Sequence, residues 1–236
     1  MLWESFSLIS TRQKFITSKI DNMNQNPDEK YKAKWDNRYK DHEFAYGKAP
    51  NSFFEVWLKK FEPGAVLMPA DGEGRNGVFA AQLGWNVTSF DLSKEGQSKA
   101  LQLAKERGVT LQYLVGEQAQ LGLEKEKFDA IGLIYAHVSA EKKSIFHREL
   151  NDYLRPGGIV IFEAFSKKHL HFRNLDPKVG GPDDLNMLFS KSEIMADFEN
   201  YDILMLEEEE IILNEGKYHN GRGSVIRFVG RKTAMI

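Results

Sequence analysis

The hydrophobic and polar positions of the chain alternate between two kinds of segment. Some segments are short, nearly continuous apolar runs of the kind that form buried strands. Others place apolar residues at helical spacing. The expected strands are 65–70, 86–91, 110–115, 128–135 and 157–165, and the expected helices between them are 75–84, 93–107 and 141–154. Strands that alternate with helices predict a parallel sheet covered by helices on both faces.

The two ends of this pattern differ from its middle. Before it, residues 35–39 and 52–58 have the periodicity of amphipathic helices, separated by a turn-rich stretch. After it, residues 201–213 and 223–231 are two strand-like runs joined by the polar segment 214–221. We therefore expect an α/β fold: a doubly wound, Rossmann-like sheet that is mostly parallel and ends in an antiparallel hairpin.

The length of 236 residues fits one domain with a sizeable core, which we place at 23–236. Within it, residues 166–189 have little periodicity and contain the turn residues of 179–182, so we expect a long loop that serves as a lid or substrate wall. Residues 1–22 lack the basic region and continuous apolar core of a secretory signal, and we expect a flexible extension.

The composition narrows the function classes. A net charge of -2 gives no general attraction to nucleic acid or to a membrane surface, and no apolar run has the length of a membrane span. The absence of cysteine excludes disulfides, thiolate nucleophiles and cysteine-ligated metal, and it is compatible with a cytoplasmic location. We expect a small-molecule partner rather than a nucleic acid or a membrane.

A glycine-rich turn follows the first apolar run. Gly72-x-Gly74-x-x-Gly77 connects this expected strand to an expected helix, so its backbone N–H groups lie at the positive end of the helix dipole. Asp91 ends the next apolar run, where a carboxylate can accept both hydroxyls of a ribose. Together they predict a nucleoside-bearing cofactor. The turn alone also fits a nicotinamide dinucleotide, although the chain is short for a dehydrogenase with a separate substrate domain.

Three motifs carry a resemblance to a known family. Val66-Leu-Met-Pro-Ala-Asp-Gly-Glu-Gly-Arg-Asn76 resembles the first motif of class I S-adenosylmethionine-dependent methyltransferases, in particular the tellurite-resistance and thiopurine-methyltransferase subgroup. The segment 128–138 is similar to the fourth-strand motif of that family, and 154–164, with Leu-x-Pro-Gly-Gly, is similar to its fifth strand. The resemblance runs from about residue 35 to 232 and implies a seven-stranded sheet with an antiparallel last strand.

The resemblance also implies a cofactor, S-adenosyl-L-methionine, and positions that hold it. The methionine part of the cofactor would lie against the glycine-rich turn, its ribose at Asp91, its adenine after the third strand and its methyl group near the end of the fourth. The implied residues are Ala70, Asp71, Gly72, Glu73, Gly74, Asn76, Asp91, Leu92, Glu117, Gln118 and Tyr135.

Two positions depart from the family pattern. Met68 stands where the family has an acid that holds the cofactor's amino group, and Ala70 stands where it has the first glycine of the turn. Asp71 or Glu73 is expected to supply the missing carboxylate from the same turn. The alternative is a protein that keeps the fold with weakened or lost cofactor binding.

Candidates for the acceptor side are aromatic, acidic and histidine side chains. They are Trp35, Tyr39, Tyr46, His137, Glu163, His171 and His219. Each also has an ordinary structural reading, since aromatic residues pack and buried histidines form hydrogen bonds. The histidine spacings match no standard metal pattern, so we expect no metal site. Methyl transfer from a sulfonium needs positioning above all, so no catalytic residue is assigned. The expected function is methyl transfer to a small molecule, such as a thiol or a chalcogen oxyanion, by direct displacement; the alternatives are a non-catalytic binding protein of the same fold and an NAD(P)-dependent oxidoreductase.

Overall fold

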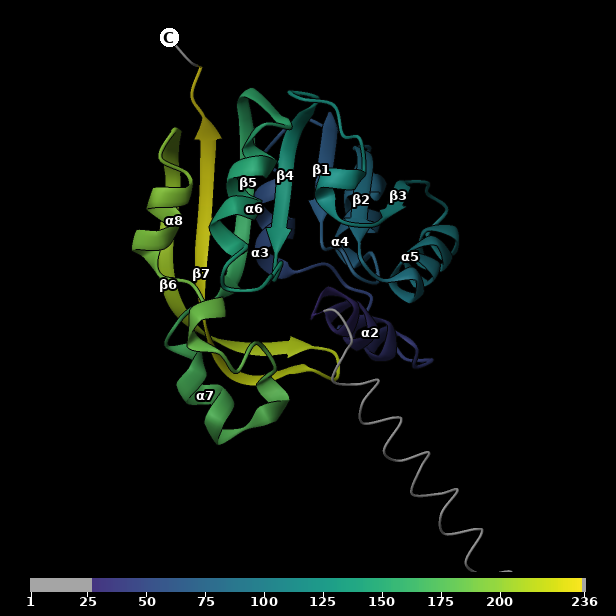
Figure 1. The fold of residues 1–236 in the computed structure, drawn as a ribbon. Helices are drawn as coiled ribbons and strands as arrows, with labels where there is room; N and C mark the ends of the chain where they lie inside the picture. The colour runs from purple at the N-terminus through teal and green to yellow at the C-terminus, as the bar shows by residue number, and fades with distance from the viewer. Residues whose placement is uncertain (1–26, 235–236) are drawn as a thin grey trace, which may run out of the picture.

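The computed structural model describes residues 27–234, and these form a seven-stranded sheet in the order β3-β2-β1-β4-β5-β7-β6 (Figure 1). The strands β1 to β5 run parallel, while β7 pairs antiparallel with both β5 and β6. The strands are β1 (Ala65–Pro69), β2 (Asn86–Asp91), β3 (Gln112–Val115), β4 (Phe128–Ile134), β5 (Leu154–Phe165), β6 (Tyr201–Glu215) and β7 (His219–Lys232). The predicted fold class is confirmed.

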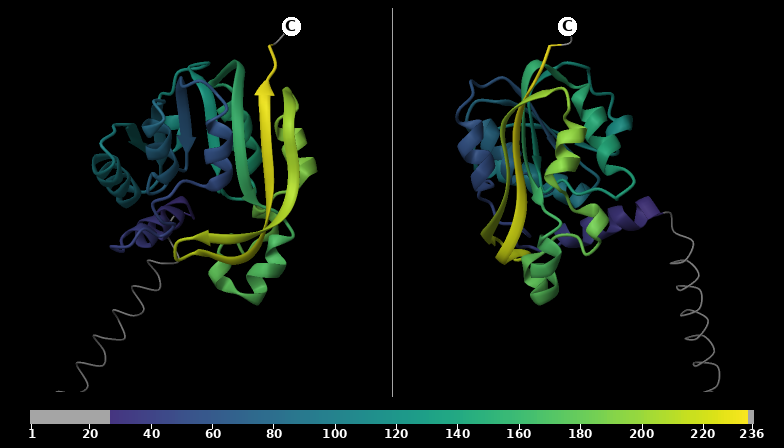
Figure 2. Two further views of the ribbon diagram at one scale, coloured as in Figure 1. Left: turned by 180° about the vertical axis from the view of Figure 1, so that it is seen from behind. Right: turned by 90° about the vertical axis from the view of Figure 1, so that its left-hand side faces the viewer.

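Helices cover both faces of the sheet (Figure 2). The helices are α2 (Pro27–Tyr39), α3 (Ser52–Leu58), α4 (Arg75–Gln82), α5 (Lys94–Glu106), α6 (Lys143–Asn151), α7 (His169–Leu175) and α8 (Lys191–Asp197). Short 3-10 turns lie at η1 (Gln118–Gln120), η2 (Pro177–Val179) and η3 (Leu185–Met187). Phe54 of α3 and Ala80 of α4 pack on one face, whereas Leu150 of α6 and Ile194 of α8 pack on the other. The central strands are therefore buried on both sides, which explains their continuous apolar runs.

The β6–β7 hairpin reaches beyond the rest of the sheet. Its far end passes beneath the carboxyl ends of the central strands and extends toward α2 (Figure 1). Lys217 N–H donates to the carbonyl of Ala45 at 3.0 Å, which ties the hairpin turn to the loop after α2. Gly216 has φ +69°, and a Cβ there would lie 2.6 Å from the backbone nitrogen of Gly47. Glycine is required at this contact because two backbones meet.

Two expectations about secondary structure need correction. The segment 166–189, expected as a long loop, contains α7, η2 and η3, and it buries Val179 and Leu188 against the end of the hairpin. Its short turns lack a repeated apolar face, so the sequence periodicity does not reveal them. The helix expected at 141–154 is shorter, because residues from Leu154 onward already belong to β5. The extension 1–22 lies outside the described residues.

Candidate functional site

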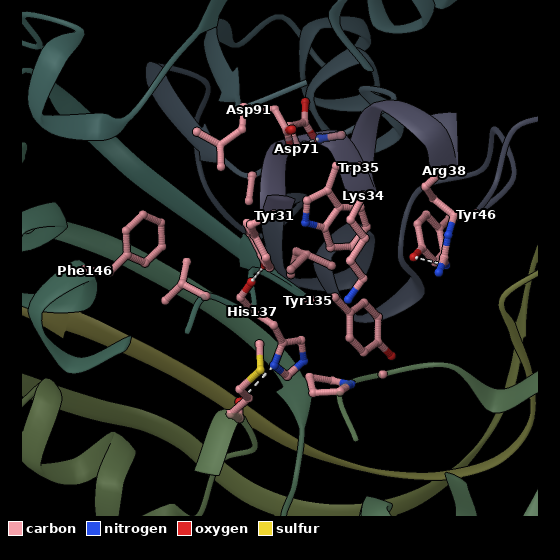
Figure 3. Close-up of a pocket in the computed structure, with 18 of the residues that line it drawn as sticks. Tyr31, Lys34, Trp35, Arg38, Tyr46, Asp71, Asp91, Tyr135, His137 and Phe146 are labelled. Carbon is pink, nitrogen blue, oxygen red and sulfur yellow. Dashed lines mark hydrogen bonds between the residues drawn. The ribbon is translucent and has the colours of Figure 1, made fainter. Parts of the chain in front are cut away.

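A cavity of about 670 Å³ lies between the carboxyl ends of β1 to β4 and helix α2 (Figure 3). In open parallel sheets this is the edge at which ligands bind. The cavity brings together most of the residues singled out in the sequence. Those that line it are Trp35, Tyr39, Tyr46, Ala70, Asp71, Gly72, Glu73, Asn76, Asp91, Leu92, Glu117, Gln118, Tyr135, His137 and His219.

Three of the predicted site residues do not line the cavity. Gly74 begins α4 with φ +80°, and a Cβ there would meet Ala100 of α5 at 2.5 Å, so its place is in helix packing. Glu163 is 1% exposed and accepts hydrogen bonds from Asn51 and Arg227, so it joins α3, β5 and β7. His171 is exposed on α7. The assignments of Gly74, Glu163 and His171 to ligand contacts are therefore not supported by their positions.

The turn after β1 holds an alanine in a conformation that favours glycine. Ala70 has φ +51°, in the left-handed region, where a Cβ costs roughly 1 kcal/mol. The structure thus explains why the family places a glycine there. Tyr135, at the end of β4, has φ +52°. Both residues line the cavity, and strained backbone of this kind is typical of functional sites.

Asp91 ends β2 and lies beside the glycine-rich turn (Figure 3). Its carboxylate accepts hydrogen bonds from the N–H groups of Gly72 at 3.0 Å and Ser93 at 2.9 Å. Burial raises its pKa to about 6, although these hydrogen bonds lower it in part. Each carboxylate oxygen keeps a second lone pair. Asp91 is therefore fixed in position and retains the capacity to accept further hydrogen bonds from a ligand in the cavity.

Met68 and the two acids expected to compensate for it each have contacts within the protein. Met68 is 1% exposed and packs in the core with Phe54 and Gly132, away from the cavity lining. The carboxylate of Asp71 accepts from the hydroxyl of Ser89 at 2.7 Å. Glu73 accepts from Ala45 N–H and forms an ion pair with Lys99, both at 2.8 Å. Both acids have partners within the protein, but both also line the cavity and a carboxylate can accept further hydrogen bonds, so replacement of the missing acid by either one stays a prediction.

Gln118 follows β3, at the place expected for adenine recognition. Its Nε2 donates to Glu149 at 3.2 Å, which fixes the orientation of the amide. Its Oε1 is buried and has no hydrogen-bond partner among residues 27–234. A buried acceptor without a donor is costly, and a ligand amino group would satisfy it. This orphaned atom in the cavity lining fits a nucleobase with an exocyclic amine.

Two buried histidines, His137 and His169, have both ring nitrogens engaged, and His137 lines the cavity. Nε2 of His137 accepts from Phe165 N–H at 3.3 Å, so Nδ1 donates to the carbonyl of Met187 at 3.2 Å. His169 accepts from Ser224 N–H at 3.3 Å and donates to the carbonyl of Gly180 at 3.1 Å. Burial lowers the pKa of His137 to about 3 and that of His169 to about 4. The hydrogen bonds of His137 favour a role in holding the structure over a role as a base or in substrate binding.

Helix α2 contributes cavity residues that the sequence interpretation missed. Tyr31, Lys34 and Arg38 line the cavity with Trp35, which stacks on Tyr39 at 5.6 Å between ring centroids. Figure 3 shows Arg38 directed toward Tyr46, to whose hydroxyl it donates at 3.1 Å. Tyr31, Trp35 and Arg38 follow one another at spacings of four and three, and Lys34 lies three residues after Tyr31, so these spacings could have indicated a shared helix face. The cavity also takes Arg173, Gly180 and Tyr218 from distant segments, which no local pattern predicts.

The described part of the chain has neither a metal-binding cluster nor a membrane-spanning helix. Between residues 27 and 234, no group of three or more metal-ligating His, Cys, Asp or Glu side chains has a suitable arrangement for a metal ion. No helix in the same range has both the length and the apolar character needed to cross a membrane.

The comparisons with known proteins agree with this geometry. A methyltransferase domain model matches residues 67–162, which includes the glycine-rich turn, Asp91 and Gln118. The match supports the predicted enzyme class, a methyltransferase, and structures of the same fold include one described as S-adenosylmethionine-dependent, in agreement with the predicted cofactor. A comparison with curated protein sequences gives no match.

Solved structures share the fold over most of the chain. One, described for the conversion of a disulfide bond into a thioacetal group during echinomycin biosynthesis, has a TM-score of 0.67 and 21% identity over 86% of this chain and 92% of that chain. An S-adenosylmethionine-dependent methyltransferase from Methanosarcina mazei has a TM-score of 0.62 and 15% identity over 76% and 98%. TehB from Haemophilus influenzae has a TM-score of 0.61 and 16% identity over 78% and 62%. At these identities the likeness shows the fold.

Proposed function

We propose that the protein binds S-adenosyl-L-methionine and a small-molecule acceptor in this cavity and transfers the methyl group from one to the other by direct displacement. The observation that carries the proposal is that one cavity joins two groups of residues. Asp91 and Gln118 lie where the ribose and adenine of the cofactor are expected, and Tyr135 and His219 lie on the acceptor side. A cofactor and an acceptor bound there would share one enclosed space.

The residues present fit the cofactor. Asp91 would accept the ribose hydroxyls, and Oε1 of Gln118 would accept a hydrogen bond from the adenine amine. The backbone of Ala70 to Glu73 would border the methionine part, and Asn76, Leu92, Glu117 and Tyr135 would complete the site. The bound cofactor supplies an electrophilic methyl group on a sulfonium centre. The protein's contribution is to hold the acceptor in line with that group and to exclude water.

The acceptor side favours a small molecule. It is enclosed by α2, by Gly180 and Gly181 of the segment 166–189, and by Tyr218 and His219 at the hairpin turn. This arrangement supports a wall or lid role for that segment.

The charged residues on the acceptor side favour an acceptor that is negatively charged or that loses a proton during the reaction. Lys34, Arg38 and Arg173 line this side together with the acid Asp183, whereas the other cavity-lining acids, such as Asp71 and Asp91, lie on the cofactor side. Thiols and chalcogen oxyanions, acceptors of the tellurite-resistance and thiopurine-type subgroup, have this character. The structural relative described for echinomycin biosynthesis also concerns chemistry at sulfur.

The test is methyl transfer itself. Purified protein is incubated with S-adenosylmethionine carrying a labelled methyl group and a panel of aromatic thiols, selenite and tellurite, and methylated products are identified by mass spectrometry. We expect labelled product with at least one acceptor. Binding of the cofactor without product across a broad panel would favour the second candidate, a non-catalytic binding protein, which the buried Met68 motivates. A protein that binds NADH but does not bind S-adenosylhomocysteine would favour the third candidate, an oxidoreductase.

The absence of cysteine is compatible with the reducing cytoplasm, where we propose that the protein acts. Fractionation of cells that express the full chain tests this location directly.

A further inference from the structure

His219 differs from His137, which also lines the cavity, and from the buried His169. Its Nδ1 lies 3.1 Å from Oε2 of Glu215, four residues earlier across the hairpin turn. Because an ionised carboxylate only accepts hydrogen bonds, Nδ1 carries the proton and Nε2 carries a lone pair. Nε2 has no hydrogen bond to any described residue, and His219 lines the cavity. It therefore presents an unused acceptor nitrogen on the acceptor side.

Glu215 is held in place from three directions. Oε2 also accepts from Arg75 Nη2 at 3.0 Å, and Oε1 accepts from Asn51 Nδ2 at 3.1 Å. Burial raises the pKa of Glu215, but the hydrogen bond with His219 and the charge of Arg75 outweigh it, and the pKa is about 2. The carboxylate is thus ionised at neutral pH. It fixes the tautomer of His219 and would stabilise a positive charge on its ring.

The imidazole ring lies close to the expected position of the reacting methyl group. Its centroid is 4.5 Å from the ring of Tyr135, at the end of β4, and 4.6 Å from that of Tyr46. Phe165 contacts it edge-on at 5.1 Å. The charged or titratable groups around it, from β6, α4, α2, the loop after α2, β4 and α7, are Glu215, Arg75, Arg38, Tyr46, Tyr135, His137 and His169.

We propose that His219 is the general base of the methyl transfer and that the acceptor enters as a protonated nucleophile, X–H. This inference rests on the proposed function. The acceptor proton passes to Nε2, the X–CH₃ bond forms as the methyl–sulfur bond breaks, and the electron pair of that bond remains on sulfur. Neutral S-adenosylhomocysteine and methylated acceptor result, and the proton later leaves His219 for water. Glu215 is a positioning residue.

The surroundings of His219 suit this role. Burial lowers its pKa, and the hydrogen bond and charge of Glu215 oppose that shift. The imidazole is therefore neutral at neutral pH, as a base must be before the reaction. The aromatic wall formed by Tyr46, Tyr135 and Phe165 favours an acceptor with an aromatic ring. Aromatic and benzylic thiols or phenols are the class of acceptor that this site fits.

The first test needs no acceptor. ¹⁵N NMR of the histidine rings is recorded on the full chain loaded with S-adenosylhomocysteine, with His219→Gln used to assign the signals. We expect His219 to be neutral at pH 7, protonated on Nδ1, with an Nε2 signal that responds when an aromatic thiol is added. Protonation on Nε2, or an imidazolium at pH 7, overturns the proposal whether or not the protein transfers methyl groups.

The second test compares two acceptors. Benzyl mercaptan is protonated at pH 7, whereas 4-nitrothiophenol is largely ionised. His219→Gln should lower kcat with benzyl mercaptan by about 100-fold with little change in KM, and should lower it far less with 4-nitrothiophenol. Glu215→Gln should lower kcat with benzyl mercaptan, as His219→Gln does, and should shift the pH profile of this rate. His171→Gln, on the exposed side of α7, should change the rate with neither acceptor. Equal losses with both acceptors, or none, would contradict the role of His219 while leaving methyl transfer itself established.

Discussion

The hydroxyl of Tyr31 donates a hydrogen bond to the backbone carbonyl of His137, and this bond joins α2 to the end of β4 across the cavity. A second contact, from Ser93 Oγ to Asp36 at 2.6 Å, joins α2 to the loop after β2. Helix α2 is otherwise very polar: its exposed positions include Lys30 and Asn37. A few specific hydrogen bonds therefore hold this helix over the site.

Removing the first of these contacts should loosen the helix. A single hydrogen bond contributes about 1 kcal/mol, so Tyr31→Phe should speed the release of S-adenosylhomocysteine about fivefold. Stopped-flow fluorescence is suited to this measurement because Trp35 lines the cavity. Tyr153→Phe, outside the cavity lining, is the matched control. Equal release rates in both variants would show that α2 does not gate the site.

An acid at position 68, as in the family pattern, should destabilise the folded protein. Met68 is fully surrounded by core residues, and Gly132 leaves room for its thioether. Met68→Asp buries a carboxylate without a partner, so we expect the free energy of unfolding to fall by roughly 3 kcal/mol or more. Met68→Leu should cost less than about 1.5 kcal/mol. Urea unfolding measures both. A stable Met68→Asp variant that binds S-adenosylmethionine more tightly would contradict this assignment of position 68 to the core.

Asp71 predicts a pH dependence of stability. Burial raises its pKa from 3.8 to about 7, so between these values the folded state keeps a proton that the unfolded state has lost. This contribution to stability is complete below about pH 4 and is lost as the pH rises through 7, on the order of 1 kcal/mol per pH unit. Asp91, with a pKa of about 6, acts in the same direction.

The variant Asp71→Asn isolates this effect. Denaturant unfolding at pH 4, 5, 6 and 7 should show a smaller decline in the variant than in the wild type. Asp202→Asn, at an exposed position on β6, should keep the wild-type decline. If Asp71→Asn and the wild type declined in parallel, the raised pKa of Asp71 would not be real.

The sequence predicted the sheet well because strands depend on local patterns, and the cofactor-side residues were chosen from the same local patterns. Apolar runs specify buried parallel strands, and Asp91 ends β2 while Gln118 lies shortly after β3. The acceptor side could not be predicted in the same way. Tyr46, Gly180 and His219 meet through backbone contacts between the loop after α2, the segment after α7 and the hairpin turn. Such contacts between distant segments leave no periodicity in the sequence.

Met68 and Ala70 illustrate two different departures from the family pattern. Ala70 keeps the left-handed backbone conformation of the glycine that it replaces, so the turn retains its shape at a small cost. Met68 replaces a polar function by core packing. The sequence showed both substitutions, but the structure was needed to show that the first preserves the turn and that Asp71 and Glu73 already have internal partners.

Calorimetric titration of S-adenosylhomocysteine tests the central claim most directly, because it probes the cofactor side without knowledge of the acceptor. The wild type and Asp202→Asn should bind one equivalent per chain with the same affinity. Asp91→Asn should remain folded and bind more than tenfold more weakly, since the ribose loses its charged acceptor. Equal affinity in Asp91→Asn and the wild type, or no binding by the wild type, would contradict the account.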